Sequence, residues 1–325
     1  MVRTLAIRPW NRVLLLVTMT AALIPLLGPR PAHAVPGRIR EFVVPTSSSH
    51  PGGIVLGPDS AVWFTEIATG AIGRLQGRTF TTFPLPQGGL PNAIAVGPDG
   101  ALWFTEYWDD RVGRITTGGQ ITEYSVPDAG PWDIVSGPDD ALWFTELDAN
   151  RIGRITPLGA VTHFDLPSQD TAPDGITNGP DGALWFTDGG GVGRITTGGS
   201  ATHRWSGNSG GGITTGPDGN LWFVQDSSDA VARLSPSTGR VKDFPIDLGC
   251  FPQEIEPGAG AVWFTCYFLD EVGRVTMDGR VTPFPVPNHF QGNYPDTLEG
   301  IATGASNDMW FTEEAANRIG RISTS

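Results

Sequence analysis

The residues of this chain that could do chemistry stand at variable positions of a repeated unit. Most units place a Pro-x-x-Ile strand before a Gly-Pro-Asp turn and a Trp-Phe-Thr strand after it, so the start of the first strand and the end of the second lie at the same end of the unit. Aromatic and amide residues gather at these positions, and we predict that they bind substrate: Trp132, Tyr107, Trp108, Tyr267, Phe268 and Gln253. With the carboxylates Asp174, Glu299 and Glu314 they predict a funnel that suits a small-molecule or cyclic peptide ligand. The alternative is loops that vary on a solvated rim.

Glu299 is the sharpest candidate for a general base. Burial among Trp132, Tyr267 and Phe268 would raise the pKa of its carboxyl group toward the range that proton abstraction needs. The chain has five histidines, His33, His50, His163, His203 and His289. Of these, His50 and His289 could reach the funnel mouth, whereas a surface place is expected for His163 and His203 on outer strands.

A second set of acids recurs too regularly to favour catalysis. An acid follows the tryptophan by three residues in five units, as Glu66, Glu106, Glu146, Asp188 and Glu313. An arginine recurs on the third strand of every unit, as Arg74, Arg114, Arg154, Arg194, Arg233, Arg274 and Arg321. We therefore predict that these two series pair within each unit, with metal binding by one or two of the acids as the alternative.

The repeat itself predicts the elements that position these groups. The tryptophan after the turn falls at Trp63, Trp103, Trp143, Trp185, Trp222, Trp263 and Trp310, with gaps of 40, 40, 42, 37, 41 and 47 residues. Each unit contains four short apolar, β-branched or aromatic runs separated by Gly, Pro and Asp turns, and no run shows a helical period. Four antiparallel strands in each of seven units predict an all-β, seven-bladed β-propeller.

The two ends of the repeat predict how the ring closes. Residues 38–45, RIREFVVP, match the fourth strand of a unit, whereas residues 317–325 stop after a third strand. We expect the N-terminal strand to complete the last blade, which leaves no unpaired sheet edge and favours a monomer.

Residues 1–34 are typical of a signal peptide. Arg3, Arg8 and Arg12 precede an apolar run, and Ala32-His33-Ala34 forms a cleavage site, so we expect a secreted, extracellular mature chain of residues 35–325 with one domain. Removal of residues 1–34, which contain four arginines and no acidic residue, would change the formal charge from −13 to −17. This acidity argues against nucleic acid and against anionic membrane surfaces as partners.

Cys250 and Cys266 are the two cysteines of the chain. They flank the turn that replaces Gly-Pro-Asp in the sixth unit, so they should lie across one hairpin. In an exported protein this arrangement favours a disulfide, with a metal-binding or catalytic pair as the alternative.

The repeated pattern P-x-x-I-x-x-GPDG-x-LWFTE-x-x-x-N-R-I-G-R-I-T, nearly complete at residues 131–156, resembles the virginiamycin B lyase family across all seven units. The resemblance implies an elimination that opens the ester ring of type B streptogramins with Mg²⁺, and it implies antibiotic resistance. It places catalytic or metal-binding carboxylates at Glu314 or its neighbour Glu313. The family's histidines, which act as general bases, are replaced here within Pro252-Gln253-Glu254-Ile255 and Leu298-Glu299-Gly300-Ile301.

Three functions follow as alternatives. The first is a Mg²⁺-dependent carbon–oxygen lyase in which Glu299, Glu314 and Glu313 are catalytic and Glu314, Glu313 and Asp174 hold the metal. The second is a catalytically inactive ligand-binding propeller, favoured by the two absent histidines. The third is a metal-dependent lactone hydrolase, for which Asp174, Gln253, Glu254 and Glu299 offer ligands at the channel.

Overall fold

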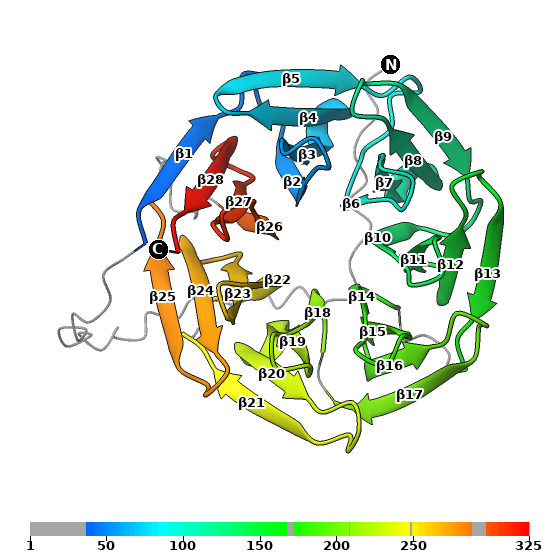
Figure 1. The fold of residues 1–325 in the computed structure, drawn as a ribbon, viewed down its shortest axis with the longest axis vertical. Coiled ribbons are helices and arrows are strands. Elements are labelled where there is room, and N and C mark those ends of the chain that lie inside the picture. The colour runs from blue at the N-terminus through cyan, green and yellow to red at the C-terminus, as the bar shows by residue number, and fades with distance from the viewer. Residues whose placement is uncertain (1–36, 168–171, 208, 248, 288–296, 325) are drawn as a thin grey trace, which may run out of the picture. The chain divides into compact units, whose positions relative to one another are not determined.

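The structure is a computed structural model that describes residues 37–167, 172–207, 209–247, 249–287 and 297–324. In these residues, 28 strands form seven four-stranded antiparallel sheets arranged as a ring around a central opening (Figure 1). The predicted seven-bladed β-propeller is therefore confirmed. The predicted signal peptide and His289 lie outside the described residues.

Each blade runs from an inner strand at the channel to an outer strand at the rim, in chain order except in blade 7. Blades 1 to 4 consist of β2 (Pro51–Leu56), β3 (Val62–Glu66), β4 (Ala71–Gln76) and β5 (Thr79–Pro84); β6 (Ile94–Val96), β7 (Leu102–Glu106), β8 (Arg111–Ile115) and β9 (Ile121–Ser125); β10 (Pro131–Ser136), β11 (Leu142–Glu146), β12 (Arg151–Ile155) and β13 (Val161–Asp165); and β14 (Ile176–Asn178), β15 (Leu184–Asp188), β16 (Gly191–Ile195) and β17 (Ala201–Ser206).

Blades 5 to 7 consist of β18 (Ile213–Thr215), β19 (Leu221–Gln225), β20 (Ala230–Leu234) and β21 (Val241–Pro245); β22 (Pro252–Gly258), β23 (Ala261–Cys266), β24 (Glu271–Thr276) and β25 (Val281–Pro285); and β26 (Leu298–Thr303), β27 (Met309–Glu313), β28 (Arg318–Ile322) and β1 (Ile39–Val43). Three short 3-10 turns follow second strands, at Ile67–Thr69, Tyr107–Asp109 and Asp226–Ser228. No helix in the described part of the chain is long and apolar enough to cross a membrane.

The recurrent tryptophans form the core between blades, as predicted. Six of the seven are at most 2% exposed, and Trp310 is half-buried. Trp103 stacks on Tyr124 of the outer strand, with ring centroids 5.6 Å apart. A phenylalanine of the outer strand stacks in the same way on Trp63, Trp143 and Trp222. Burying this much aromatic surface between neighbouring sheets is the main apolar contribution to holding the ring together.

The recurrent arginines do not pair with the recurrent acids of the second strand, and that prediction is wrong. In blades 1 to 5 they pair with the aspartate of the Gly-Pro-Asp turn, as Arg114 Nε donates to Asp99 Oδ2 at 2.6 Å, and in blade 7 Arg321 pairs with Asp308. Asp99 also accepts from the indole Nε1 of Trp103 at 3.0 Å. Burial alone would raise the pKa of Asp99, but the hydrogen bonds from Trp103, Arg114 and the backbone of Ala101, together with the charge of Arg114, outweigh it and lower the pKa.

The acids of the second strand have other partners inside their own blades. Glu146 accepts from Arg151 Nε at 2.7 Å and contacts His163 Nδ1 at 2.5 Å, while Asp188 contacts His203 Nε2 at 3.0 Å. The cause is strand register. In blades 2, 3 and 7 a different arginine, at the start of the third strand, lies opposite the acid, whereas the recurrent arginine lies opposite the tryptophan. His163 and His203 are therefore on outer strands, as expected, but they are partners of enclosed carboxylates.

A threonine hydroxyl joins six of the seven blades to the next blade at the channel. Thr145 Oγ1 donates to the carbonyl of Asp174 in the next blade at 2.7 Å and accepts from the N–H of Asp133 in its own blade at 3.0 Å. The donation to the next blade recurs from Thr65, Thr105, Thr187, Thr265 and Thr312. Blade 5 has Val224 at this position, and there the backbone N–H of Gly212 bonds Gln253 directly at 2.7 Å.

The ring closes as predicted, because β1 pairs antiparallel with β28 along its whole length. Asn317 fastens the segment that follows β1. Its side-chain oxygen accepts from both the backbone N and the hydroxyl of Ser49, and its amide nitrogen donates to the carbonyls of Val44 and Thr46. The start of blade 1 is thereby held against the end of blade 7.

Replacing Thr145 by Val should destabilise the ring by about 1–3 kcal/mol, because the buried N–H of Asp133 and the carbonyl of Asp174 lose their partner. Urea unfolding measures the change. Thr145→Ser keeps the hydroxyl and serves as the control. Equal stability of the Val and Ser variants would contradict the assigned role.

Candidate functional site

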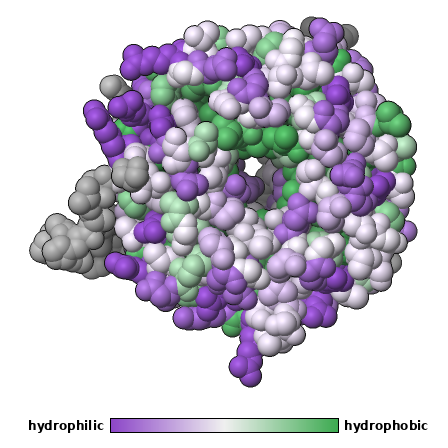
Figure 2. All heavy atoms as spheres, viewed as in Figure 1, coloured by the Kyte–Doolittle hydropathy of each residue, from purple (hydrophilic) through white to green (hydrophobic). Residues whose placement is uncertain are grey.

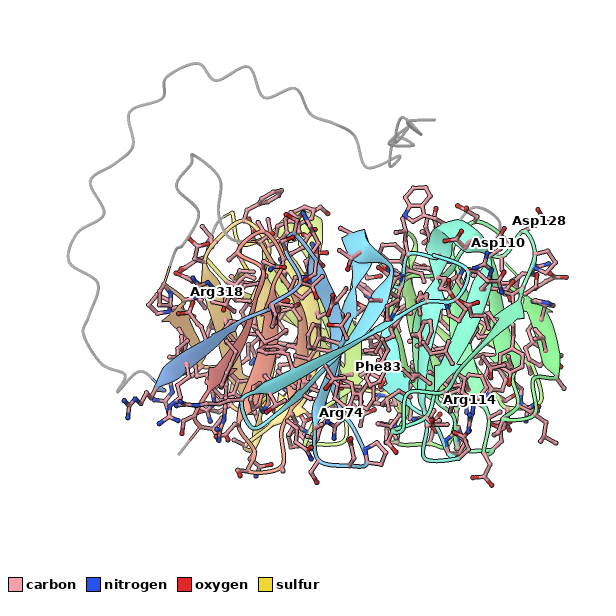
Figure 3. All side chains as sticks on the ribbon, turned by 90° about the horizontal axis from the view of Figure 1, so that it is seen from above. Arg74, Phe83, Asp110, Arg114, Asp128 and Arg318 are labelled. Carbon is pink, nitrogen blue, oxygen red and sulfur yellow. A yellow bond between two sulfur atoms is a disulfide. The ribbon has the colours of Figure 1, made fainter. Side chains whose placement is uncertain are left out.

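The two faces of the ring differ in chemistry. Arg74 and Arg114 lie at one edge of the ring and Asp110 at the other, as Figure 3 shows. We call the face of Asp110 the upper face, which carries the ends of the second strands and the starts of the first strands. Asp110 itself shapes this face, since its Oδ1 accepts from the backbone N–H groups of Ala129 and Gly130 at the start of blade 3.

A histidine and a carboxylate meet on the upper face where blade 7 joins blade 1. His50 Nδ1 lies 3.1 Å from Glu314 Oε1, although 264 residues separate the two in sequence. The other carboxylate oxygen of Glu314 accepts from Thr297 Oγ1 at 3.4 Å. The His50 side chain is 44% exposed and that of Glu314 is 22% exposed, so the pair is open to a ligand on this face.

Tyr267 and Glu299 complete this group from blades 6 and 7. Burial raises the pKa of Tyr267, and the negative charges of Glu314 and Glu299 raise it further, so the phenol keeps its proton throughout the neutral range. Tyr267 is therefore a hydrogen-bond donor beside two carboxylates. We call His50, Tyr267, Glu299 and Glu314 the seam group.

Aromatic residues gather in two clusters on the same face. In the first, the ring of Tyr107 contacts Trp108 at 4.7 Å and Trp132 at 5.4 Å, both edge to face. In the second, Phe268 contacts Tyr267 at 4.9 Å and Phe251 at 5.3 Å. Trp108 and Phe268 are 53% and 51% exposed, which is unusual for such large apolar groups and suits ligand contact. The predicted aromatic walls are thus present as two separate surfaces.

The predicted disulfide is confirmed. Cys250 and Cys266 are bonded, and they directly precede Phe251 and Tyr267 of the second cluster in sequence. The bond ties the segment before β22 to the end of β23. It therefore holds the backbone from which these two aromatic rings extend.

Carboxylates from three blades, Asp133, Asp174 and Glu254, interact through their charges near the channel, whose opening is visible in Figure 2. Burial raises the pKa of Asp133 to about 7, and the charge of Asp174 adds to the rise. Burial also raises the pKa of Glu254 well above its ordinary value, with contributions from Asp133, Asp174 and Glu299. Glu299 therefore interacts both with the channel carboxylates and with the seam group.

The carboxylates predicted to be catalytic or metal-binding are not brought into one place. Glu314 lies in the seam group, and Asp174 lies in the channel, where its Oδ2 accepts from the N–H of Gly211 at 2.8 Å. Glu313 is fully enclosed in blade 7, at the register occupied by the acids of the other blades. In the described residues, no group of three or more His, Cys, Asp or Glu is arranged to hold a metal ion. These residues do not fit a magnesium site of the predicted composition.

Gln253 is the second residue of β22 and is half-buried, and its backbone carbonyl accepts from the N–H of Gly212. The sequence indicates that His50 could reach the funnel mouth, but it does not indicate a partner for this side chain. Ring closure is the signal that could have identified Glu314 as the partner, since it brings the start of the first blade beside the end of the last blade.

Glu256 is a further carboxylate that lies outside the seam group. It is opposite Trp263 in blade 6, where the other blades place Val, Ala or Thr opposite their tryptophan. Burial raises the pKa of Glu256 to about 8, despite a hydrogen bond from the backbone of Thr303. The folded protein thus keeps a proton that the unfolded chain releases at lower pH.

Stability should consequently fall as pH rises from about 4.5 to about 8, because the folded state binds more protons than the unfolded state in this window. Glu256→Gln should stabilise the protein at pH 9 by about 2 kcal/mol or more and change little at pH 5. Urea unfolding at the two pH values measures this. Asp243→Asn, which removes an exposed carboxylate from β21, is the control for net charge. A gain that is the same at both pH values would contradict the raised pKa.

Comparison with known proteins supports this architecture. No curated protein sequence gives a significant match. Among solved structures, virginiamycin B lyase from Staphylococcus aureus is 32% identical, with a TM-score of 0.81 over 89% of this chain and 99% of that chain. A catalytically inactive histidine-to-alanine form of the same enzyme with quinupristin is 32% identical, with a TM-score of 0.82 over 89% and 99%. A streptogramin B lyase is 30% identical, with a TM-score of 0.81 over 89% and 98%.

A sequence model described as the Virginiamycin B lyase family matches residues 37–206 and 204–325, which together span all seven blades. The chain therefore belongs to the virginiamycin B lyase family.

Proposed function

We propose that this protein is an exported carbon–oxygen lyase that opens cyclic ester substrates of the streptogramin type by elimination on its upper face. Support for the reaction class comes from family membership together with one observation. Tyr267, kept protonated, belongs to one of the two exposed aromatic clusters and interacts with the charges of Glu299 and Glu314. This arrangement offers groups for acid–base chemistry next to apolar surface that a cyclic peptide can cover.

The proposed reaction starts at a carbon next to a carbonyl group. A base removes the proton from that carbon, and the electron pair forms a carbon–carbon double bond. The neighbouring carbon–oxygen bond of the ester breaks, and the carboxylate leaves with the bonding electrons. In this proposal the protonated Tyr267 hydroxyl donates a hydrogen bond to the oxygen on which negative charge develops.

Elimination and hydrolysis give products of different mass, which provides the direct test. Mature protein incubated with quinupristin, another type B streptogramin and a panel of lactones should yield a ring-opened product of unchanged mass and shifted retention in liquid chromatography with mass detection. Reactions with Mg²⁺ and with a chelator test the magnesium dependence that the family resemblance implies. A product heavier by one water would favour the lactone hydrolase, and no turnover would favour the ligand-binding propeller.

Tyr267→Phe should lower kcat about 10²-fold, because the transition state loses a donor while the aromatic ring remains. Steady-state kinetics by absorbance or mass detection measures the effect. Tyr124→Phe is the matched control, since Tyr124 stacks on a core tryptophan far from the upper face. A Tyr267→Phe enzyme with unchanged kcat would exclude the proposed donor.

Trp108→Ala should raise KM about tenfold and leave kcat within a factor of two, because the side chain is 53% exposed and belongs to the aromatic cluster away from the seam group. Substrate titration of both proteins measures the two constants. A fall in kcat with unchanged KM would place the reaction, rather than binding, at this cluster.

A further inference from the structure

We infer that His50 is the general base of this enzyme and that Glu314 positions its imidazole ring. The inference rests on the proposed function and extends it, because both positions at which family members carry catalytic histidines hold other residues in this chain, namely Gln253 and Glu299. His50 stands instead at the start of blade 1, across the join from Glu314 of blade 7.

The hydrogen bond between the two side chains decides which ring nitrogen can act. An ionised carboxylate only accepts hydrogen bonds. Nδ1 of His50 therefore carries a proton and donates the hydrogen bond to Glu314 Oε1. In the neutral ring, Nε2 then keeps its lone pair and is the basic atom. The side chain is 44% exposed, so a substrate proton can reach it.

The backbone around His50 is held in place on both sides. Ser49 bonds the side chain of Asn317 through its N–H and its hydroxyl, and the carbonyl of His50 accepts from the N–H of Ile67 at 3.1 Å. His50 itself has a φ of 51°, which lies in the left-handed region. Histidine tolerates this conformation better than most residues, and the bonds to Asn317 and Ile67 maintain it.

Two other histidine–carboxylate pairs show what distinguishes this one. His163 and His203 contact Glu146 and Asp188, but they lie on the outer strands β13 and β17, and their carboxylate partners are completely enclosed. Of the three pairs, the one formed by His50 joins the first and last blades, has a carboxylate that is itself partly exposed, and lies beside the protonated Tyr267. Its place, rather than the pairing alone, points to catalysis.

The proposed proton transfer needs no reagent other than the protein and its substrate. Nε2 of His50 takes the proton from the carbon next to the substrate carbonyl, and the released electron pair forms the double bond as the carbon–oxygen bond breaks. The imidazolium that forms is stabilised by Glu314, and it returns its proton to the leaving carboxylate or to water.

The experiment compares His50→Asn and His50→Gly with the unaltered protein on the substrate that the unaltered protein turns over. Asn and Gly both accept a positive φ, so the loop should keep its structure, and thermal unfolding checks this. We expect kcat to fall about 10²- to 10⁴-fold with KM within a factor of three. Added imidazole should restore activity to His50→Gly. His203→Gln is the matched control, and its kcat should stay within a factor of two.

Glu314 is tested through the rescued enzyme. Glu314→Ala should lower kcat about tenfold in the unaltered protein, but it should not change the imidazole-rescued rate of His50→Gly, because free imidazole does not depend on the hydrogen bond to Glu314.

The outcomes separate this inference from the proposed function. Turnover by the unaltered protein with unchanged kcat in both His50 variants would overturn the inference and leave the lyase standing. Loss of kcat without imidazole rescue would assign His50 a structural role and also overturn it. Absence of turnover in the unaltered protein would remove the lyase and the base together.

Discussion

The structure depends on one hydroxyl group that is repeated around the channel. In most blades, a threonine on the second strand donates to a backbone carbonyl at or just before the start of the next blade's inner strand, as Thr105 does to Trp132 and Thr312 does to Gly52. Because the accepting residues include Trp132 and Glu299, this hydrogen bond helps to set the positions of these upper-face residues. Aromatic packing holds the blades together over a large area, but the directional bond fixes their register.

The candidate site lies where the ring closes, and this has a physical reason. Closing the ring requires the first residues to be fastened to the last blade, which β1 and Asn317 accomplish. The same fastening brings His50 beside Glu314 and limits the freedom of the loop between them. The contacts that remove the open edge of the sheet therefore also orient the ionisable groups, so stability and the proposed chemistry depend on the same segment.

The pKa values of aspartates shift in opposite directions in different parts of the ring. Asp99, on the face opposite the upper face, receives hydrogen bonds from an indole and a guanidinium, which help to hold its pKa low despite burial. Asp133 in the channel is buried near Asp174 and Glu254, and its pKa rises to about 7. The acidity of the chain is thus divided into carboxylates neutralised by arginine and carboxylates that can keep a proton near neutral pH.

The sequence by itself determined the architecture, the core and the disulfide. The period near forty residues predicted seven blades, repetition marked the tryptophans as core, and the hairpin between Cys250 and Cys266 predicted their bond, because these features depend on local strand pairing. The tertiary structure alone decided the partners of side chains. It paired Arg114 with Asp99 rather than Glu106, enclosed Glu313, and joined His50 to Glu314. Such contacts depend on strand register and on ring closure across 264 residues, which no local pattern encodes.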